Sequence, residues 1–409
     1  MSVLEVKSRV WFYKKMYPGK EKDIANILGL RGLEVSSYTI DSRLCQPGGC
    51  FFALPGRQTD GTQFLSEVAG LGGVAAIVPK SYQGPDFGLR ICRVADVKLM
   101  MRQVAALVYS KRRTCVIGVT GSVGKTTIKE FTATVLGGVY RSPGSYNSQL
   151  TLPLCVLNCP EDAKLAVLEY GMSRKGEMQK LVDLAPPNIG IVGPIAYSHA
   201  ESFDSLNEIA QEKLKLVQDV RLKVVHSSTG ADGLIYDRES MPFRLPFDAP
   251  HLVENAKAAV CVARFLGLCD DQIQAGLDKI QIVERRGTIT EYEGVTYYND
   301  SYNANVTSFK AALAACPKKK RQIAVVGSMG ELGKFSQSCH RQLGDMLKEI
   351  DEVLCIGKEC QLICEMLGAK AKYFDEFDAL KLKLQSMVQE GDVVLIKGSN
   401  VHQLWRLIP

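Results

Sequence analysis

The sequence contains no long hydrophobic run. No stretch approaches the ~20 uncharged apolar residues that a membrane-spanning helix requires. Residues 1–20 also lack the apolar segment of a secretory signal peptide. Their charged side chains include Glu5, Lys7, Arg9, Lys14 and Lys15. We therefore expect a cytoplasmic protein without a membrane span.

The chain also lacks a strong excess of charge of either sign. It has 50 Lys and Arg against 44 Asp and Glu, which gives a net charge of +6 over 409 residues. This excess is too small to indicate the clustered basic face of a nucleic-acid-binding protein, so we expect no such partner. Polyanionic small molecules remain candidate partners. At roughly 100–200 residues per domain, the length predicts two to four domains.

Cysteine, in contrast, is abundant, with 13 residues. A disulfide framework normally belongs to a short secreted chain, whereas several of these cysteines lie inside apolar runs. Examples are Cys115, Cys155, Cys261 and Cys355. We predict buried, reduced thiols. Cys360 and Cys364 are four residues apart, but no His or Cys cluster completes a zinc site around them.

From residue 111 onward, short β-branched runs alternate with helical stretches, which favours parallel sheets covered by helices. We predict an α/β protein with domains at 1–110, 111–288 and 289–409. The predicted strands cover residues 114–119, 165–168, 189–192, 323–326, 353–356 and 393–396. The predicted helices cover residues 96–110, 206–217, 255–266 and 270–280.

The strongest local pattern is a glycine-rich run at 118–127, between a β-branched strand and a helical stretch. Backbone N–H groups in such a loop surround phosphate oxygens, Lys125 would reach the outer phosphates, and Thr126 would bind Mg²⁺. The strict pattern has Gly where this chain has Val119, and the alternative is a glycine-rich turn followed by a chance Lys-Thr pair. We predict nucleotide binding by Thr120, Gly121, Ser122, Val123, Gly124, Lys125, Thr126 and Thr127.

Two further side chains follow predicted strands. Glu169 comes directly after the strand at 165–168, where a carboxylate points into the ligand crevice of a parallel sheet. His199 follows the strand at 189–192 and the turn at Gly193 and Pro194. Spacing alone leaves both residues open between a metal ligand and an ordinary surface residue.

The loop at 120–127 resembles that of the Mur ligase family, which shares it with folylpolyglutamate synthases. The resemblance runs from about residue 35 to 405, in family order. Further matching segments are 39–43, 51–56, 199–203 leading to Lys213, 299–305, and 327–333 with His340. The run Asp300-Ser301-Tyr302-Asn303-Ala304-Asn305 is the most specific of them.

The resemblance implies a three-domain enzyme. A small N-terminal α/β domain would hold a UDP-sugar, a central P-loop domain ATP, and a C-terminal Rossmann-like domain would close over both. ATP would phosphorylate a peptide carboxylate, and an amine would attack the acyl phosphate. The run at 300–305 resembles the branch that adds D-Ala-D-Ala to UDP-N-acetylmuramoyl-tripeptide in peptidoglycan synthesis. Addition of a single amino acid, folate glutamylation and a non-ligating regulatory protein remain alternatives.

The resemblance also implies roles for individual residues, in a monomer that acts on small molecules. Lys125, Glu169, His199 and Lys213 would be catalytic. Thr126 and Glu169 would hold one Mg²⁺, and His199 a second together with Lys213 carbamylated by CO₂. The additional nucleotide-binding residues would be Asn255, Arg286, Asp300 and Asn303. The substrate-binding residues would be Asp41, Ser42, Arg43, Asn147, Asn305, Lys397 and Ser399.

Carbamylation of Lys213 requires a neutral amine, which burial favours. A solvated helix lysine is the alternative, since Lys215 lies two positions further on. The chain departs from the family pattern at Leu252, which replaces an Asn before the helix, at Lys215, which replaces an acidic residue, and at Asn400, which replaces an Arg.

Overall fold

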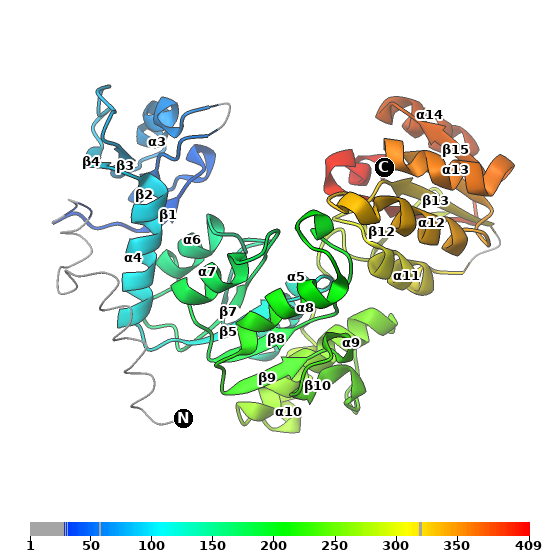
Figure 1. Ribbon diagram of the computed structural model, residues 1–409, viewed down its shortest axis with the longest axis horizontal. Coiled ribbons are helices and arrows are strands. Elements are labelled where there is room, and N and C mark those ends of the chain that lie inside the picture. Colours follow the sequence, from blue (N-terminus) through cyan, green and yellow to red (C-terminus); the bar gives the residue numbers. More distant parts are fainter. Residues whose placement is uncertain (1–27, 29, 31, 57–58, 319–320) are drawn as a thin grey trace. The chain divides into compact units, whose positions relative to one another are not determined.

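The computed structural model describes residues 28, 30, 32–56, 59–318 and 321–409 (Figure 1). The segment 1–20, on which the expectation of no signal peptide rests, lies outside these residues. The described strands form three sheets of four, six and six strands. The chain divides into two compact units. The first unit comprises Met1–Ile117, Tyr140–Tyr170 and Gln179–Asn188, and the second Gly118–Val139, Gly171–Met178 and Ile189–Pro409.

The first unit contains a four-stranded parallel sheet in the order β1-β2-β3-β4. Its elements are β1 (Ser37–Thr39), β2 (Gly49–Phe52), α3 (Leu65–Gly70), β3 (Ala75–Pro79), β4 (Arg90–Val94) and α4 (Val97–Lys111). The side chain of Asp96 caps α4 by accepting a hydrogen bond from the N–H of Leu99. The helix predicted at 96–110 is therefore confirmed.

The remainder of the first unit pairs β6 (Tyr140–Arg141) in parallel with β7 (Leu165–Glu169). Helix α6 (Thr151–Leu157) lies between them in sequence, and most of α7 (Glu177–Leu184) follows. Strand β5 (Cys115–Thr120) begins in this unit and ends in the second. The strands predicted at 114–119 and 165–168 are confirmed to within one residue at each end.

The second unit begins with the phosphate loop and α5 (Lys125–Val135). Strands β8 (Ile189–Val192), β9 (Leu222–Val225) and β10 (Leu234–Ile235) pair in parallel in that order. The helices that follow β8 in this part are α8 (Leu206–Leu214), α9 (Pro250–Phe265) and α10 (Asp270–Leu277). Apolar side chains of α5, α9 and α10, among them Phe131, Ala256 and Ile273, share one core cluster.

Three helix predictions were wrong at one or both ends. Helix α10 ends at Leu277, three residues before the predicted end at 280. Helix α9 begins at Pro250 rather than at Asn255, because proline is well tolerated in the first turn. Helix α8 ends at Leu214, and residues 215–217 form a tighter 3₁₀ turn instead of continuing it.

The last sheet has the order β11-β12-β16-β13-β14-β15 and is parallel except for the β11–β12 pair. Its strands are β11 (Thr288–Tyr292), β12 (Val295–Asn299), β13 (Arg321–Gly327), β14 (Glu352–Ile356), β15 (Ala371–Phe374) and β16 (Asp392–Lys397). Its helices are α11 (Val306–Ala315), α12 (Ser336–Met346), α13 (Gln361–Leu367) and α14 (Phe377–Met387).

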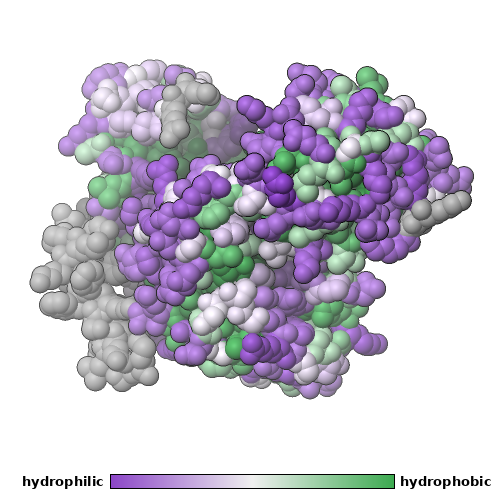
Figure 2. Space-filling view, turned by 45° about the vertical axis from the view of Figure 1, so that its right-hand side comes forward, coloured by the Kyte–Doolittle hydropathy of each residue, from purple (hydrophilic) through white to green (hydrophobic). Residues whose placement is uncertain are grey.

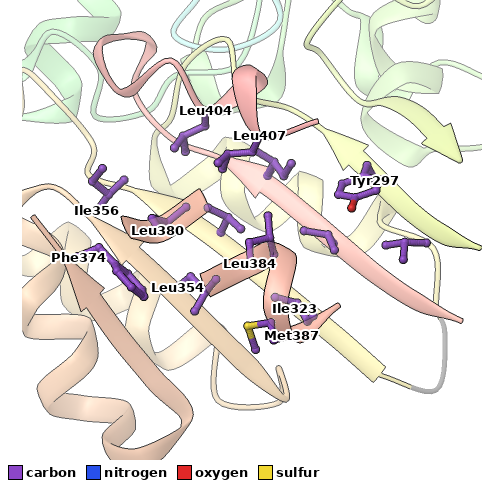
Figure 3. Packing of buried hydrophobic residues seen from close by; sticks show 14 residues of the cluster. Tyr297, Ile323, Leu354, Ile356, Phe374, Leu380, Leu384, Met387, Leu404 and Leu407 are labelled. Atoms are coloured by element: carbon purple, nitrogen blue, oxygen red, sulfur yellow. The ribbon is translucent and has the colours of Figure 1, made fainter. Parts of the chain in front are cut away.

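Side chains of β13 alternate between the two faces of this sheet. Ile323 packs in a cluster with Leu380 and Leu384 of α14 (Figure 3). Val325 belongs to the same cluster. Ala324 and Val326 belong to the opposite cluster, which α11, α12 and α13 cover. A strand buried on both faces reads as a continuous β-branched run, which is why the sequence predicted it. The predicted α/β fold class is confirmed.

The surface and the thiols also agree with the sequence. No helix among the described residues is long and apolar enough to cross a membrane. On the face shown in Figure 2, hydrophilic residues lie between small hydrophobic areas. All 13 cysteines lie in the described part of the chain and none of them is in a disulfide, and Cys155 and Cys355 are buried. Cys115 and Cys261 are only half-buried, which corrects the prediction for these two.

Candidate functional site

The phosphate loop connects β5 to α5 and packs against the segment that follows β8. Gly121 and Gly124 adopt φ angles of +154° and +78°, which favour glycine. A Cβ at Gly121 would lie 3.0 Å from the Cα of Gly193. The Ser122 hydroxyl donates to the carbonyl of Ala196 at 2.8 Å. The loop therefore has little freedom to take another shape.

The loop's lysine and its neighbours have the expected places. Lys125 is the first residue of α5, and its Nζ donates to the carbonyl of Gly121 at 3.0 Å. Thr126 and Thr127 follow on the same helix and are buried. The helix N-terminus and the backbone N–H groups of the loop together favour an anion at this position.

Asn255 reaches the loop from α9. A Cβ on Gly124 would lie 2.7 Å from Oδ1 of Asn255, so the amide touches the loop backbone. Leu252, one helical turn earlier, instead packs in the core cluster with Phe131 of α5. The departure at Leu252 thus places an apolar side chain in the interior.

Lys213 lies on α8 with only 1% of its surface exposed. Burial lowers the pKa of its amine well below the ordinary value, and the charge of Lys125 lowers it further. Its neighbour Glu212 is also buried and accepts a hydrogen bond from Lys215 at 2.7 Å. The lysine at the family's acidic position therefore pairs with Glu212, and the alternative of a solvated Lys213 is wrong.

His199 follows β8 and adopts a left-handed φ of 54°. Its Nδ1 contacts the carboxylate of Glu331 and lies 3.4 Å from the hydroxyl of Ser173. Burial lowers the pKa of the imidazole, the charges of Lys125 and Lys213 add to this effect, and Glu331 opposes it. The structure thus places His199 within the electrostatic field of both lysines.

Arg286 lies just before β11 in the chain, and its side chain contacts the phosphate loop. Its guanidinium donates to the hydroxyl of Thr126 at 2.9 Å. The same group lies over the ring of Tyr302, 4.0 Å from its centre. The planar guanidinium therefore has one face stacked and one edge directed at the loop.

Lys397 ends β16 and is 1% exposed. Its ammonium lies 2.5 Å from Oδ2 of Asp300 and 2.9 Å from the carbonyl of Asn303. Burial lowers the pKa of Lys397, while Asp300 opposes this shift. These three predicted residues therefore form one group at the carboxyl end of β16.

Two other predicted residues of the last sheet have structural contacts. The side chain of Asn305 accepts a hydrogen bond from the N–H of Ser308 and caps α11. The backbone N–H of Ser399 donates to the carbonyl of Ser328 at 3.2 Å. Asn400, the third departure from the family pattern, is exposed.

The first unit holds the other predicted site residues in two places. The amide of Asn147 donates to Oε1 of buried Glu169 at 2.7 Å. Asp41 accepts from the guanidinium of Arg43 at 2.6 Å, and this hydrogen bond lowers the pKa of the Asp41 carboxyl. Ser42, between them, is buried.

The described residues contain no group of three or more His, Cys, Asp and Glu side chains that could hold a metal ion. A divalent cation at His199 would therefore need a ligand of another kind. Burial lowers the pKa of the Lys213 amine and so favours the neutral form that reacts with CO₂, which makes Lys213 a residue that could supply such a ligand. Mg²⁺ itself prefers oxygen ligands, which a carbamate would supply.

Sequence reasoning missed two contacts of this site. Glu331 and Tyr302 lie in the segments 327–333 and 299–305 that resemble the family, but no role was predicted for either residue. The contact of Glu331 with His199 joins residues far apart in the chain. The stacking of Arg286 on Tyr302 joins residues 16 positions apart. No spacing rule predicts contacts of that kind.

Two segments match known family models. Residues 119–227 match the Mur ligase middle domain, and residues 284–400 match the Mur ligase glutamate ligase domain. The UDP-N-acetylmuramoyl-tripeptide–D-alanyl-D-alanine ligase of Escherichia coli (strain K12) is 30% identical over 90% of this chain and 92% of its own length. The ligase of the same name from Bacillus subtilis (strain 168) is 28% identical over 91% and 92%.

Solved structures resemble the fold over nearly the whole chain. The MurF ligase from Thermotoga maritima in complex with ADP has a TM-score of 0.77 and 25% identity, covering 92% of this chain and 97% of that one. MurF from Acinetobacter baumannii has a TM-score of 0.80 and 24% identity, covering 94% and 96%.

The parallel sheets and the glycine-rich loop at the start of α5 define a P-loop α/β protein. The matches to both family models and to the Escherichia coli relative narrow this class. The chain belongs to the Mur ligase family of ATP-dependent, ADP-forming ligases.

Proposed function

We propose that the protein joins D-Ala-D-Ala to UDP-N-acetylmuramoyl-tripeptide and so makes the pentapeptide precursor of peptidoglycan. ATP transfers its γ-phosphoryl group to the terminal carboxylate of the tripeptide, which gives an acyl phosphate and ADP. The amine of D-Ala-D-Ala attacks the acyl carbon, an amide forms, and phosphate leaves. The enzyme therefore needs no nucleophile of its own.

The main obstacle in this reaction is the repulsion between a carboxylate and a triphosphate. Lys125 neutralises the outer phosphates, and its position at the start of α5, beside Gly121, supports this role. Arg286, which donates to Thr126, adds a second positive charge at the same loop. Thr120, Ser122, Val123 and Thr127 complete the phosphate loop, and Asn255 supports it at Gly124.

Two Mg²⁺ ions supply further positive charge when bound. We assign one to Thr126 and Glu169, and the second to His199 and Lys213. The neutral amine of Lys213 would form a carbamate with CO₂ and release one proton, which turns an uncharged amine into an anionic oxygen ligand. The burial of Lys213 and its lowered pKa support this assignment.

The remaining residues contact the nucleotide and the substrates. Asp300 and Asn303 are proposed to face the ribose and base of ATP. The proposed substrate-binding residues are Asp41, Ser42, Arg43, Asn147, Asn305, Lys397 and Ser399. We further propose domains at 1–110, 111–288 and 289–409, a monomer, and action in the cytoplasm, where ATP and UDP-sugars are available.

The observation that carries the proposal is the buried Lys213, whose pKa is lowered by burial and by the charge of the P-loop residue Lys125. It is supported by the similarity, over nine-tenths of the chain, to relatives named UDP-N-acetylmuramoyl-tripeptide–D-alanyl-D-alanine ligase. The test is release of ADP and phosphate with Mg²⁺ and each substrate in turn. We expect turnover only when UDP-muramoyl-tripeptide and D-Ala-D-Ala are both present. Equal ADP release with neither or only one of them would contradict the proposal.

A further inference from the structure

The segment after β8 (residues 197–204, the β8 loop) and the segment after β13 (residues 328–335, the β13 loop) contact each other directly. The carbonyl of Glu331 accepts hydrogen bonds from the backbone N–H groups of Ala200, at 2.8 Å, and Glu201, at 3.2 Å. A Cβ on Gly333 would lie 3.1 Å from the Cα of Glu201. The backbones of the two loops are therefore in direct contact at this point.

Side chains extend the contact on both sides. The ammonium of Lys334 lies 2.7 Å from Oδ1 of Asp204. The rings of Tyr197 and Phe335 are stacked with their centres 4.3 Å apart. The contact thus combines backbone hydrogen bonds, an ion pair and a ring pair, and does not depend on one flexible side chain.

At the centre of this contact, the carboxylate of Glu331 pairs with Nδ1 of His199. Both residues adopt left-handed φ angles, 58° for Glu331 and 54° for His199. Non-glycine residues rarely take this conformation, and it persists where the surroundings hold it. The backbones of both loops are therefore shaped to bring these two side chains together.

A carboxylate at one imidazole nitrogen decides what the other nitrogen can do. When Nδ1 carries the proton and donates it to the carboxylate of Glu331, Nε2 of His199 keeps its lone pair. Histidines that ligate metals commonly have this arrangement, because the carboxylate fixes both the tautomer and the ring orientation.

We propose that Glu331 is a positioning residue that holds the imidazole of His199 with Nε2 available to a divalent cation. Because the last sheet supplies this carboxylate through the β13 loop, cation binding and docking of this loop on the β8 loop favour each other. The inference rests on the proposed function in one respect, namely that His199 is a cation ligand.

The test measures Mn²⁺ binding by electron paramagnetic resonance, without substrates and in bicarbonate buffer. We expect His199→Ala to lose this cation site and Glu331→Ala to weaken it about 10-fold or more. Glu331→Gln should recover part of the affinity, since its amide oxygen still accepts from Nδ1. Lys334→Ala is the matched control, because it breaks the other ion pair of the loop and leaves the imidazole untouched.

Three results would overturn the inference. Loss of the site in His199→Ala with unchanged binding in Glu331→Ala removes the role of Glu331 alone. Equal weakening in Lys334→Ala and Glu331→Ala shows that the carboxylate has no special part. Unchanged binding in His199→Ala overturns both this inference and the proposed second cation site.

Hydrogen exchange gives an independent readout of the coupling. The amides of Ala200 and Glu201 bond to the backbone carbonyl of Glu331, which every variant keeps. We expect Mn²⁺ to slow their exchange in the wild-type protein and to have little effect in Glu331→Ala. Exchange in the wild type that does not respond to Mn²⁺ would overturn the coupling between the two loops.

Discussion

The ammonium of Lys397 lies 2.5 Å from the carboxylate of Asp300, at the end of a buried strand. Removing one partner of such a pair leaves the other charge poorly solvated. We expect Lys397→Met to lower the free energy of unfolding by about 3 kcal/mol, the lower end of the usual range, because Asp300 keeps 19% exposure. Urea denaturation measures this loss.

An exposed ion pair of the same domain is the control. Lys348 lies 2.8 Å from Asp345, but the two side chains are 58% and 56% exposed. We expect Lys348→Met to change the free energy of unfolding by less than about 1 kcal/mol. Equal losses in the two methionine variants would show that burial does not set the strength of the Lys397 pair.

Gly124→Ala tests the fit of the phosphate loop. The new methyl group would lie 2.7 Å from Oδ1 of Asn255, and the φ of +78° is strained for alanine. We expect the loop to shift and the affinity for ATP, measured by isothermal titration calorimetry, to fall about 10-fold, a loss of about 1.4 kcal/mol.

Gly176 offers a matched control for this substitution. Its φ is +81°, almost the same, but a Cβ there would meet nothing within 4 Å. Gly176→Ala should therefore show the backbone strain without the collision and leave the affinity for ATP unchanged. Similar losses of ATP affinity in both variants would show that the collision with Asn255 is not the cause of the loss in Gly124→Ala.

The sequence predicted those parts of the fold that local pattern controls. Strand β8 begins and ends where its β-branched run does, at Ile189 and Val192. The glycines of the phosphate loop are where a turn of that shape needs them. The start of α9 was missed, since Pro250 and His251 lack the apolar spacing of the rest of the helix.

The site was predicted less completely for a physical reason. Its residues were found where they end a strand or begin a helix, as with Glu169 and Lys125. The pairing of Glu331 with His199 depends on how two separate loops meet. Burial of Lys213 likewise comes from packing around α8, and its own sequence neighbours, which include Lys215, suggest a solvated lysine equally well.

Lys213→Ala is expected to reduce ligase activity strongly, because it removes the amine that forms the carbamate. A small carboxylate such as acetate can occupy the space and should restore part of the activity. Lys215→Ala, which removes only the ion-pair partner of Glu212, should keep most of the ligase activity. Steady-state release of ADP measures the activity of Lys213→Ala, its rescue by acetate and the activity of Lys215→Ala. Full activity of Lys213→Ala would contradict the carbamate assignment.

His340 makes the stability depend on pH. Burial lowers the pKa of its imidazole below 6.5, and Nε2 accepts a hydrogen bond from the N–H of Met329 at 3.1 Å. At a pH between the pKa of His340 in the folded protein and its pKa in the unfolded chain, the unfolded chain binds more protons than the folded protein. The contribution of neutral His340 to the free energy of unfolding is therefore complete above pH 6.5 and is lost as the pH falls below 6.5.

The variant His340→Gln isolates this effect, since its amide does not titrate. We expect the wild-type protein to lose stability below pH 6.5 more steeply than the variant, by at most about 1.4 kcal/mol per pH unit. His199, His251 and His402 also have lowered pKa values, so the variant keeps part of the slope. Parallel stability curves would show that His340 does not contribute.

The most direct test of the proposed ligation is the mass of the product. UDP-muramoyl-tripeptide, ATP and Mg²⁺ are incubated with equal amounts of D-Ala-D-Ala and D-Ala, and the nucleotide-linked products are identified by mass spectrometry. We predict one product, heavier than the tripeptide substrate by the dipeptide less one water. A product carrying a single added amino acid, with none carrying the dipeptide, would contradict the proposal.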